Sequence, residues 1–147
     1  MRKKVIICLY APANKGKTST IRKVYKLLGG KKEVLESSYE ISDVVMRGNI
    51  KIGCESLGDP DSDQKEWLEE LLKKQCDIIV TASRTRGITV NNVVKLSQKY
   101  GYSIEWFSPL YHSGDKNEKR QKLYDLFIEK NAQAVICFID KIIGGEL

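Results

Sequence analysis

Residues 5–20, VIICLYAPANKGKTST, are the most informative part of the sequence about the fold. Residues 5–10 form an uninterrupted apolar run led by β-branched side chains, a pattern typical of a strand buried on both faces of a parallel sheet. A loop follows, and apolar side chains then recur at helical spacing until the adjacent glycines at 29–30 end the pattern. The stretch therefore predicts a central parallel strand, a loop and a helix in direct succession.

The loop and the start of the helix, residues 11–18 (APANKGKT), have the spacing of a phosphate-binding P-loop with Ala11 in place of the first glycine. Gly16 permits close approach of the backbone, Lys17 can reach the β- and γ-phosphates of a nucleotide, and Thr18 can coordinate Mg²⁺. The alternative is a basic strand-to-helix turn without a ligand. We expect a nucleotide site made of these residues: Ala13, Asn14, Lys15, Gly16, Lys17, Thr18 and Ser19.

On the residues of this motif the chain resembles the P-loop NTPase superfamily, in which alanine also occurs at the first glycine position. The resemblance extends over the whole length as an alternation of predicted strands and helices. It implies a mostly parallel sheet flanked by helices, with a Mg-nucleotide bound at the carboxyl end of the first strand. It also implies NTP hydrolysis or phosphoryl transfer, and it leaves the subfamily and the substrate open.

The order of strand, P-loop helix, antiparallel hairpin, acidic loop and helix is also similar to that of the small GTPases. In that family the strand after the hairpin ends in Asp-x-x-Gly, whereas this chain has ESLGD at residues 55–59. The chain also lacks an Asn-Lys-x-Asp guanine-reading motif after a later strand. The absence of this motif favours ATP over GTP as the nucleotide.

The rest of the chain predicts four more strands and three more helices from its apolar periodicity. The strands are expected at 41–46, 50–54, 78–81 and 103–107, the first two as an antiparallel hairpin around 47–49. The helices are expected from the N-cap Asp63 to near Gln75, from near Val90 to near Gly101, and from the capping-box pair Asp115 and Glu118 onward.

The carboxyl-terminal segment at 134–139 fits either a last strand or a helix. The spacing of its apolar residues favours a helix to near Ile143, with a break near Asn131 left open. The predicted fold class is α/β: one three-layer P-loop domain over residues 1–147, with a mostly parallel sheet of about five strands, an antiparallel hairpin, and helices on both faces.

An acidic segment follows the hairpin, with seven carboxylates and one lysine between Glu55 and Glu70. Glu55 and Asp59 lie at the end of a predicted strand, where P-loop proteins place a carboxylate that holds the Mg²⁺ shell or a water. We therefore expect Glu55 and Asp59 as metal ligands and Glu55 as a catalytic residue. The alternative is that the aspartates of this segment are turn and cap residues, which is the favoured interpretation of Asp61 and Asp63.

Two arginines, Arg84 and Arg86, follow the predicted buried strand at 78–81. Ligands of doubly wound sheets gather at the carboxyl ends of the strands, so these arginines should lie near the phosphates. An arginine there can neutralise charge on a transferring phosphoryl group or bind the phosphate of a second substrate. We expect them to be catalytic, with an ordinary solvated loop as the alternative.

A polar loop at 108–117 follows the last predicted strand. Tyr111 could stack on a base there, and Lys116, Lys119 and Arg120 could act as a lid. An ordinary surface loop is the favoured alternative.

The chain has 147 residues, a net charge of +6 and 41% hydrophobic residues, which predicts one globular domain. It contains no apolar run of about 18 residues and no signal-peptide core, so we expect a cytosolic protein without membrane contact. Residues 1–32 hold ten basic side chains and no acid, which could attract a polyphosphate or nucleic acid. The four cysteines are expected to be reduced and buried: Cys8, Cys54, Cys76 and Cys137.

These observations predict an ATP-binding protein with Mg²⁺ as its metal, which hydrolyses ATP or transfers the γ-phosphoryl group to a small acceptor. The alternative from a different class is a nucleotide-sensing or nucleic-acid-binding module with little turnover, which would use the basic amino-terminal region as its contact surface.

Overall fold

The computed structural model describes residues 3–112 and 118–147. Along the chain its elements are β1 (Val5–Tyr10), α1 (Lys17–Leu27), α2 (Lys32–Ser37), β2 (Ser42–Arg47), β3 (Ile50–Glu55), α3 (Gln64–Lys73), β4 (Ile78–Ser83), α4 (Ile88–Tyr100), β5 (Ser103–Phe107) and α5 (Glu118–Ile143). The predicted strands and helices are all present, with ends that shift by a few residues.

The strands form one five-stranded sheet in the order β2-β3-β4-β1-β5. β2 and β3 are antiparallel, whereas β3, β4, β1 and β5 run parallel to one another. β1 therefore lies inside the sheet, and the carboxyl ends of β1, β3, β4 and β5 meet at one edge. This confirms the predicted α/β class, with its mostly parallel sheet and antiparallel hairpin.

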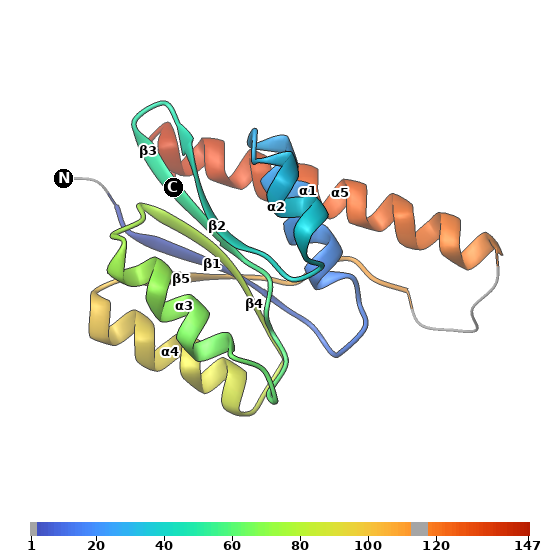
Figure 1. Ribbon diagram of the computed structural model, residues 1–147, viewed down its shortest axis with the longest axis horizontal. Coiled ribbons are helices and arrows are strands. Elements are labelled where there is room, and N and C mark those ends of the chain that lie inside the picture. The colour runs from blue at the N-terminus through green and yellow to red at the C-terminus, as the bar shows by residue number, and fades with distance from the viewer. Residues whose placement is uncertain (1–2, 113–117) are drawn as a thin grey trace.

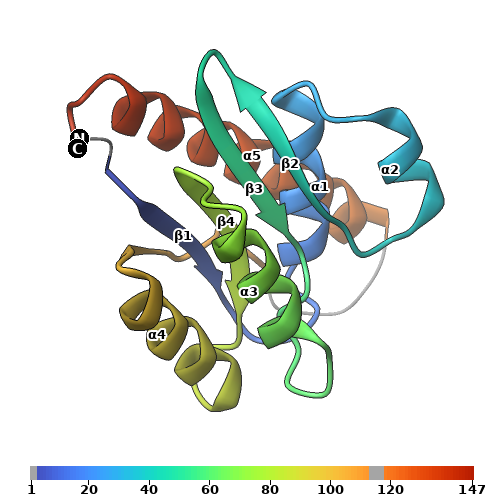
Figure 2. The same cartoon turned by 60° about the vertical axis from the view of Figure 1, so that its left-hand side comes forward.

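Helices cover both faces of the sheet. The helices α1, α2 and α5 lie on one face, and α3 and α4 lie on the other (Figures 1 and 2). The side chains of β1 alternate between the two hydrophobic cores, with Ile7 facing α1 and α5 and Ile6 facing α3 and α4. The uninterrupted apolar run of β1 thus reflects burial on both faces, as predicted.

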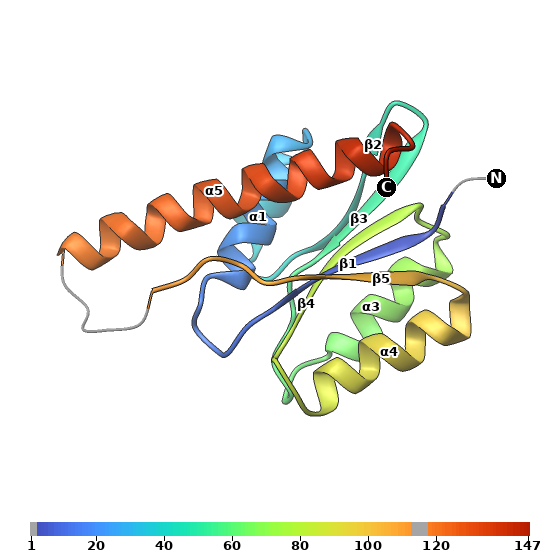
Figure 3. The same cartoon turned by 180° about the vertical axis from the view of Figure 1, so that it is seen from behind.

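The carboxyl-terminal segment is helical throughout. α5 runs without interruption from Glu118 to Ile143, so residues 134–139 form no strand and the chain does not break near Asn131. The Asn131 amide donates to the Leu110 carbonyl oxygen at 2.8 Å and accepts from the Leu110 backbone N–H at 2.9 Å. Asn131 therefore joins α5 to the connection after β5, which Figure 3 shows running beneath the helix.

Two local features differ from the sequence-based expectations. The short helix α2 was not predicted, because it buries none of its residues and shows no apolar periodicity. β4 continues past Thr81 to Ser83, because Tyr10 of β1 pairs with Ser83 and the polar side chains at the end of β4 are buried.

The predicted cap of α3 is wrong in detail. Asp63 precedes the helix but its side chain makes no capping hydrogen bond. The Gln64 backbone N–H donates instead to the Ser62 hydroxyl at 3.3 Å. Asp115, the predicted cap of α5, and Lys116 of the predicted lid lie outside the described residues.

The cysteines are all free thiols, as expected. Cys8, Cys54 and Cys76 are buried, whereas Cys137 is exposed, so the expectation of burial is wrong for Cys137. Of the helices in residues 3–112 and 118–147, none combines the length and the apolar character that a membrane span needs.

Candidate functional site

The predicted P-loop, residues 11–18, connects the carboxyl end of β1 to α1 and includes two residues with positive φ. Asn14 has φ of 61° and Gly16 has φ of 81°. A side chain at position 16 would be strained in this conformation, and its Cβ would lie 3.4 Å from Tyr124 and Ile128 of α5. Gly16 therefore permits the tight turn between β1 and α1.

The amino terminus of α1 has no side-chain cap and no acidic residue in its first turn. The first helical hydrogen bond runs from the Thr20 N–H to the Gly16 carbonyl oxygen at 2.9 Å. The N–H groups of the preceding residues in the turn have no intrahelical acceptor, and the helix dipole adds partial positive charge there. This end of α1 is therefore suited to an anion.

Lys17 is held at the edge of the sheet. Its ammonium donates to the carbonyl oxygen of Ala11, and to that of Ser83 at 2.9 Å, and the residue is 7% exposed. Burial, and next the nearby charge of Arg84, lowers the pKa of Lys17 to about 8. An anion beside this ammonium would favour its charged form.

A cavity of about 500 Å³ lies at the P-loop, within the size range of small-molecule sites. Its wall includes residues 14–18 of the P-loop and three further groups from distant parts of the chain. These groups are Tyr39 and Glu40 before β2, then Ser56, Gly58 and Asp59 after β3, and then His112, Arg120, Gln121 and Tyr124 near and within α5. Of the predicted nucleotide-binding residues, Ala13 and Ser19 are not among those lining the cavity.

The Thr18 hydroxyl meets a carboxylate that the sequence did not indicate. It donates to Glu40 Oε1 at 3.0 Å, and Ser56 Oγ donates to Glu40 Oε2 at 2.9 Å. Ser56 Oγ also accepts from the Ile41 N–H at 2.8 Å. Thr18, Glu40 and Ser56 therefore join α1, the start of β2 and the end of β3 at the cavity wall.

Glu55, expected as a metal ligand and a catalytic residue, is completely buried and does not line the cavity. The Thr81 hydroxyl donates to Glu55 Oε2, while Oε1 has no hydrogen-bond partner among the described residues. Burial raises the pKa of Glu55 well above its ordinary value. Burial therefore favours the neutral form of this carboxyl group.

Asp59 and Arg84 form an ion pair at the cavity edge. Asp59 lines the cavity, and its Oδ1 accepts from Arg84 Nη2 at 3.1 Å and from Nε at 3.2 Å. Arg86 is exposed, and neither arginine is among the residues that line the cavity. The two arginines, which the sequence treats alike, differ in that Arg84 pairs with Asp59 of the cavity wall.

The loop after Asp59 is supported by a close backbone approach. A Cβ at Gly58 would lie 2.9 Å from the Cβ of Ala82 in β4. A side chain at position 58 would force this segment away from the sheet. Gly58 therefore keeps Asp59 at the edge where Arg84 meets it.

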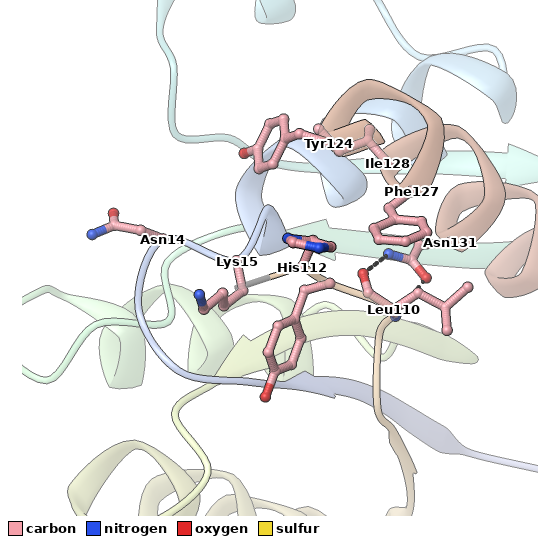
Figure 4. Close-up of a pocket in the computed structure, with 9 residues that line it drawn as sticks. Asn14, Lys15, Leu110, His112, Tyr124, Phe127, Ile128 and Asn131 are labelled. Atoms are coloured by element: carbon pink, nitrogen blue, oxygen red, sulfur yellow. Dashed lines mark hydrogen bonds between the residues drawn. The ribbon is translucent and has the colours of Figure 1, made fainter. Parts of the chain in front are cut away.

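A second pocket of only about 20 Å³ lies between the P-loop and α5, lined by Lys15, Tyr111, Tyr124 and Asn131 among others (Figure 4). This volume holds about one water and not a base. The Lys15 ammonium lies 5.2 Å from the centre of the Tyr111 ring. Tyr111 is therefore placed against the P-loop lysine and does not line the larger cavity.

The basic residues of the amino-terminal region do not form one surface. Lys15 and Lys17 line the cavity, whereas the Lys4 ammonium donates to the Gln75 carbonyl oxygen after α3 at 3.2 Å. Lys23 pairs with Glu129 of α5 at 3.2 Å. The predicted nucleic-acid contact through this region stays a prediction.

The residues that the sequence analysis missed come from outside any motif. Ser56 lies two residues after the predicted strand at 50–54, and that position was a usable signal. Glu40 stands alone before an apolar run, and Tyr124 lies in a helix whose contacts with the P-loop are long-range. Arg120, expected as a lid residue, lines the cavity from α5. Within the described residues, no group of three or more histidine, cysteine, aspartate or glutamate side chains is arranged to hold a metal ion.

Comparisons with known proteins add a similarity in structure alone. No protein-family model and no curated protein matches the chain. A de novo designed P-loop-fold protein is similar over 99% of this chain and 97% of its own, with 13% identity and a TM-score of 0.45. A probable methylase family protein from Haemophilus influenzae is similar over 96% of this chain and 70% of its own, with 11% identity and a TM-score of 0.24.

Proposed function

We propose that the protein binds Mg-ATP at the P-loop and either hydrolyses it or transfers its γ-phosphoryl group to a small acceptor. The observation that carries the proposal is the uncapped amino terminus of α1, which opens beside Lys17 and Thr18 into a cavity of about 500 Å³. Free N–H groups, an ammonium and a hydroxyl at one place are the set that a polyphosphate and its cation require.

Lys17 is the proposed phosphate-binding side chain. Its ammonium is held by two carbonyl oxygens in a position that lines the cavity. Because its charged form is disfavoured there, an exchange of carbonyl partners for phosphate oxygens would relieve that penalty. The base preference for ATP over GTP rests only on the absence of a guanine-reading motif.

The donors at the cavity suit a hard cation such as Mg²⁺. Thr18 supplies a hydroxyl oxygen, and the nearby side chains supply carboxylate oxygens. Mg²⁺ prefers such oxygen ligands together with phosphate oxygens and water. Of the two carboxylates expected at the metal, Asp59 is the better placed, because Glu55 is buried away from the cavity. The ion would neutralise charge on the phosphates.

Arg84 is the proposed catalytic arginine. Its side chain is 34% exposed, and its guanidinium is held by Asp59 of the cavity wall. From there it could stabilise charge that develops on the transferring phosphoryl group. Arg86 would then belong to the solvated loop or to a second substrate's site.

Thermal-shift measurements with ATP, GTP and tripolyphosphate, each with and without Mg²⁺, test the binding proposal. A ligand present at about 100 times its dissociation constant stabilises a folded protein by about 2.7 kcal/mol. The Lys17→Ala variant should lose this stabilisation. A Lys26→Ala variant is the matched control, because Lys26 is exposed on the same helix outside the cavity.

Phosphate release, alone and with small hydroxyl-bearing acceptors, then tests the reaction. ATP binding without turnover under any condition would favour the nucleotide-sensing module. Binding of nucleic acid with a strong salt dependence would favour the other alternative, because each phosphate contact on a duplex contributes about 0.9 to the log–log slope. Absence of any ATP-dependent stabilisation would overturn the proposal.

A further inference from the structure

We propose that Glu40 completes the cation site of this cavity, by holding the Thr18 proton and by supplying negative charge beside the ion. The inference rests on the proposed function and goes further, because it assigns the cation to a residue outside the P-loop and outside the acidic segment. The geometry that carries it is the pairing of Thr18 Oγ1 with Glu40 Oε1 at 3.0 Å.

The Thr18 hydroxyl has two acceptors within reach, Glu40 Oε1 at 3.0 Å and the Ser56 carbonyl oxygen at 3.4 Å, and the shorter contact favours donation to Glu40. A hydroxyl has one proton and two acceptor lone pairs. When the proton is donated to Glu40, both lone pairs remain for a cation. A carboxylate also has about four acceptor positions, and the hydrogen bonds from Thr18 and Ser56 occupy two of them. Glu40 therefore keeps capacity for a further electropositive partner.

A carboxylate in the wall of a polyphosphate site requires such a partner. Glu40 lines the same cavity as Lys17 and the amino terminus of α1. A free carboxylate there would repel an anionic ligand, and this repulsion is strongest where water is excluded. A divalent cation between Glu40 and the phosphates turns the repulsion into attraction on both sides. A cation is therefore the partner that would let Glu40 favour a bound polyphosphate.

The other two acidic candidates are less suited to this position. Glu55 is completely buried and accepts from Thr81. Asp59 lines the cavity, but its Oδ1 accepts two hydrogen bonds from the Arg84 guanidinium. Glu40 alone of these three carboxylates is hydrogen-bonded to the P-loop threonine.

The segment that carries Glu40 is fixed against α1. Arg22 donates to the carbonyl oxygens of Ser38 and Tyr39 at 2.7 and 2.8 Å, and also to that of Leu35 at 2.8 Å. The Ser19 and Tyr39 hydroxyls lie 3.2 Å apart. Thr18, Ser19 and Arg22 therefore hold residues 38–40 at three points, which positions Glu40 before any ligand arrives.

Calorimetric titration of ATP into wild type and Glu40→Gln, in Mg²⁺ and separately in EDTA, tests the inference. The substitution should change ATP affinity in opposite directions in the two conditions. The glutamine retains the shape and the acceptor for Thr18 but loses the charge. We expect Mg-ATP affinity to fall on the order of tenfold or more, and metal-free ATP affinity to rise, because the repulsive charge is gone. Glu36→Gln is the matched control and should change neither affinity, because Glu36 is exposed on α2 and pairs with Lys32.

Mn²⁺ provides a readout apart from ATP affinity. In the presence of ATP, the paramagnetic resonance signal of protein-bound Mn²⁺ should weaken or change in Glu40→Gln and stay unchanged in Glu36→Gln. Glu40→Asp keeps the charge and loses the reach, so it should weaken Mg-ATP binding without improving metal-free binding. This second variant also tests the inference if the glutamine variant does not fold.

The outcomes separate the two proposals. If wild type binds ATP and Glu40→Gln alters the Mg²⁺ and EDTA titrations equally or not at all, Glu40 has no role at the cation and only this inference is overturned. If wild-type protein binds no ATP in either condition, the proposed function is overturned and the inference with it.

Discussion

The cavity has two walls of different origin. One wall, residues 14–18, is continuous in sequence and obtains its shape from a left-handed glycine and a helix start. The other wall is assembled from Glu40, Ser56 and Asp59, which reach the site from separate connections of the sheet. The first wall is proposed to bind phosphate. The second wall is proposed to bind the cation and to hold Arg84 near the transferring phosphoryl group.

The difference shows how each wall tolerates change. The continuous wall depends on backbone N–H groups, so its side chains other than Lys17 and Thr18 should matter little individually. The assembled wall depends on side-chain pairs, namely Thr18 with Glu40 and Asp59 with Arg84. Substitutions in the assembled wall should therefore change metal dependence and rate, and those in the continuous wall should change affinity.

The largest expected effect is on turnover, at Arg84. Lysine keeps the charge but cannot reproduce the planar guanidinium, and a catalytic arginine contributes on the order of 10³-fold in rate. Arg84→Lys should bind ATP nearly as wild type and release phosphate far more slowly. Arg86→Lys is the control, since Arg86 is exposed and Asp59 of the cavity wall pairs with Arg84. Equal turnover in wild type and Arg84→Lys would mean that Arg84 does not stabilise the transferring phosphoryl group.

The next effect is on affinity, at Lys17. A charged hydrogen bond contributes about 1.5–3 kcal/mol, so Lys17→Ala should weaken ATP binding on the order of 100-fold. The fold should persist, because the ammonium is itself penalised by burial. Calorimetry measures the affinity and circular dichroism checks the fold. An unchanged dissociation constant for ATP would mean that Lys17 does not bind phosphate and that residues 14–18 only connect β1 to α1.

The sequence predicted the continuous wall and most of the sheet for one physical reason. β1, Gly16 and α1 are encoded by neighbours in the chain, through an apolar run, a turn residue and helical periodicity. The same reason explains why Glu40 was missed: its contact with Thr18 depends on how α1, β2 and β3 pack. The strand end near Glu55 was predicted to within one residue, but the burial of its side chain was not, because burial depends on how β3 packs. The metal and catalytic roles expected of Glu55 stay predictions.

A smaller effect is the pH dependence of phosphate binding. The pKa of Lys17 is lowered to about 8 in the free protein, and a bound anion raises it. Below pH 8 the ammonium is charged with or without ligand, so affinity should be level. Above pH 8 binding must take up a proton, and metal-free ATP affinity should fall by up to about tenfold per pH unit. Titrations of Lys17→Ala in EDTA should lack this slope, and an identical slope there would assign the titration to another group.

The smallest effect is on stability, at Glu55, the carboxyl group that lies behind both walls. Its pKa is raised well above the ordinary value by burial, so the folded state holds its proton more tightly than the unfolded chain does. This contribution to stability is fully present below the unfolded pKa, about 4.3, and is lost as pH rises toward the folded value. Glu55→Gln cannot ionise and should escape that loss.

Thermal melts of wild type and Glu55→Gln at a series of pH values measure this difference. Relative to wild type, the melting temperature of Glu55→Gln should increase as pH rises from about 4.3, by about 2–4 °C for each kcal/mol of relief in a domain near this size. Thr81 should still find an acceptor in the glutamine oxygen. Mg-ATP affinity should stay within about twofold of wild type, because a neutral buried carboxyl group supplies no charge to the cation. The opposite result is a difference in melting temperature that stays constant across pH, together with loss of the Mg²⁺ dependence of ATP binding in Glu55→Gln. That result would mean that Glu55 is ionised and contributes to the metal site.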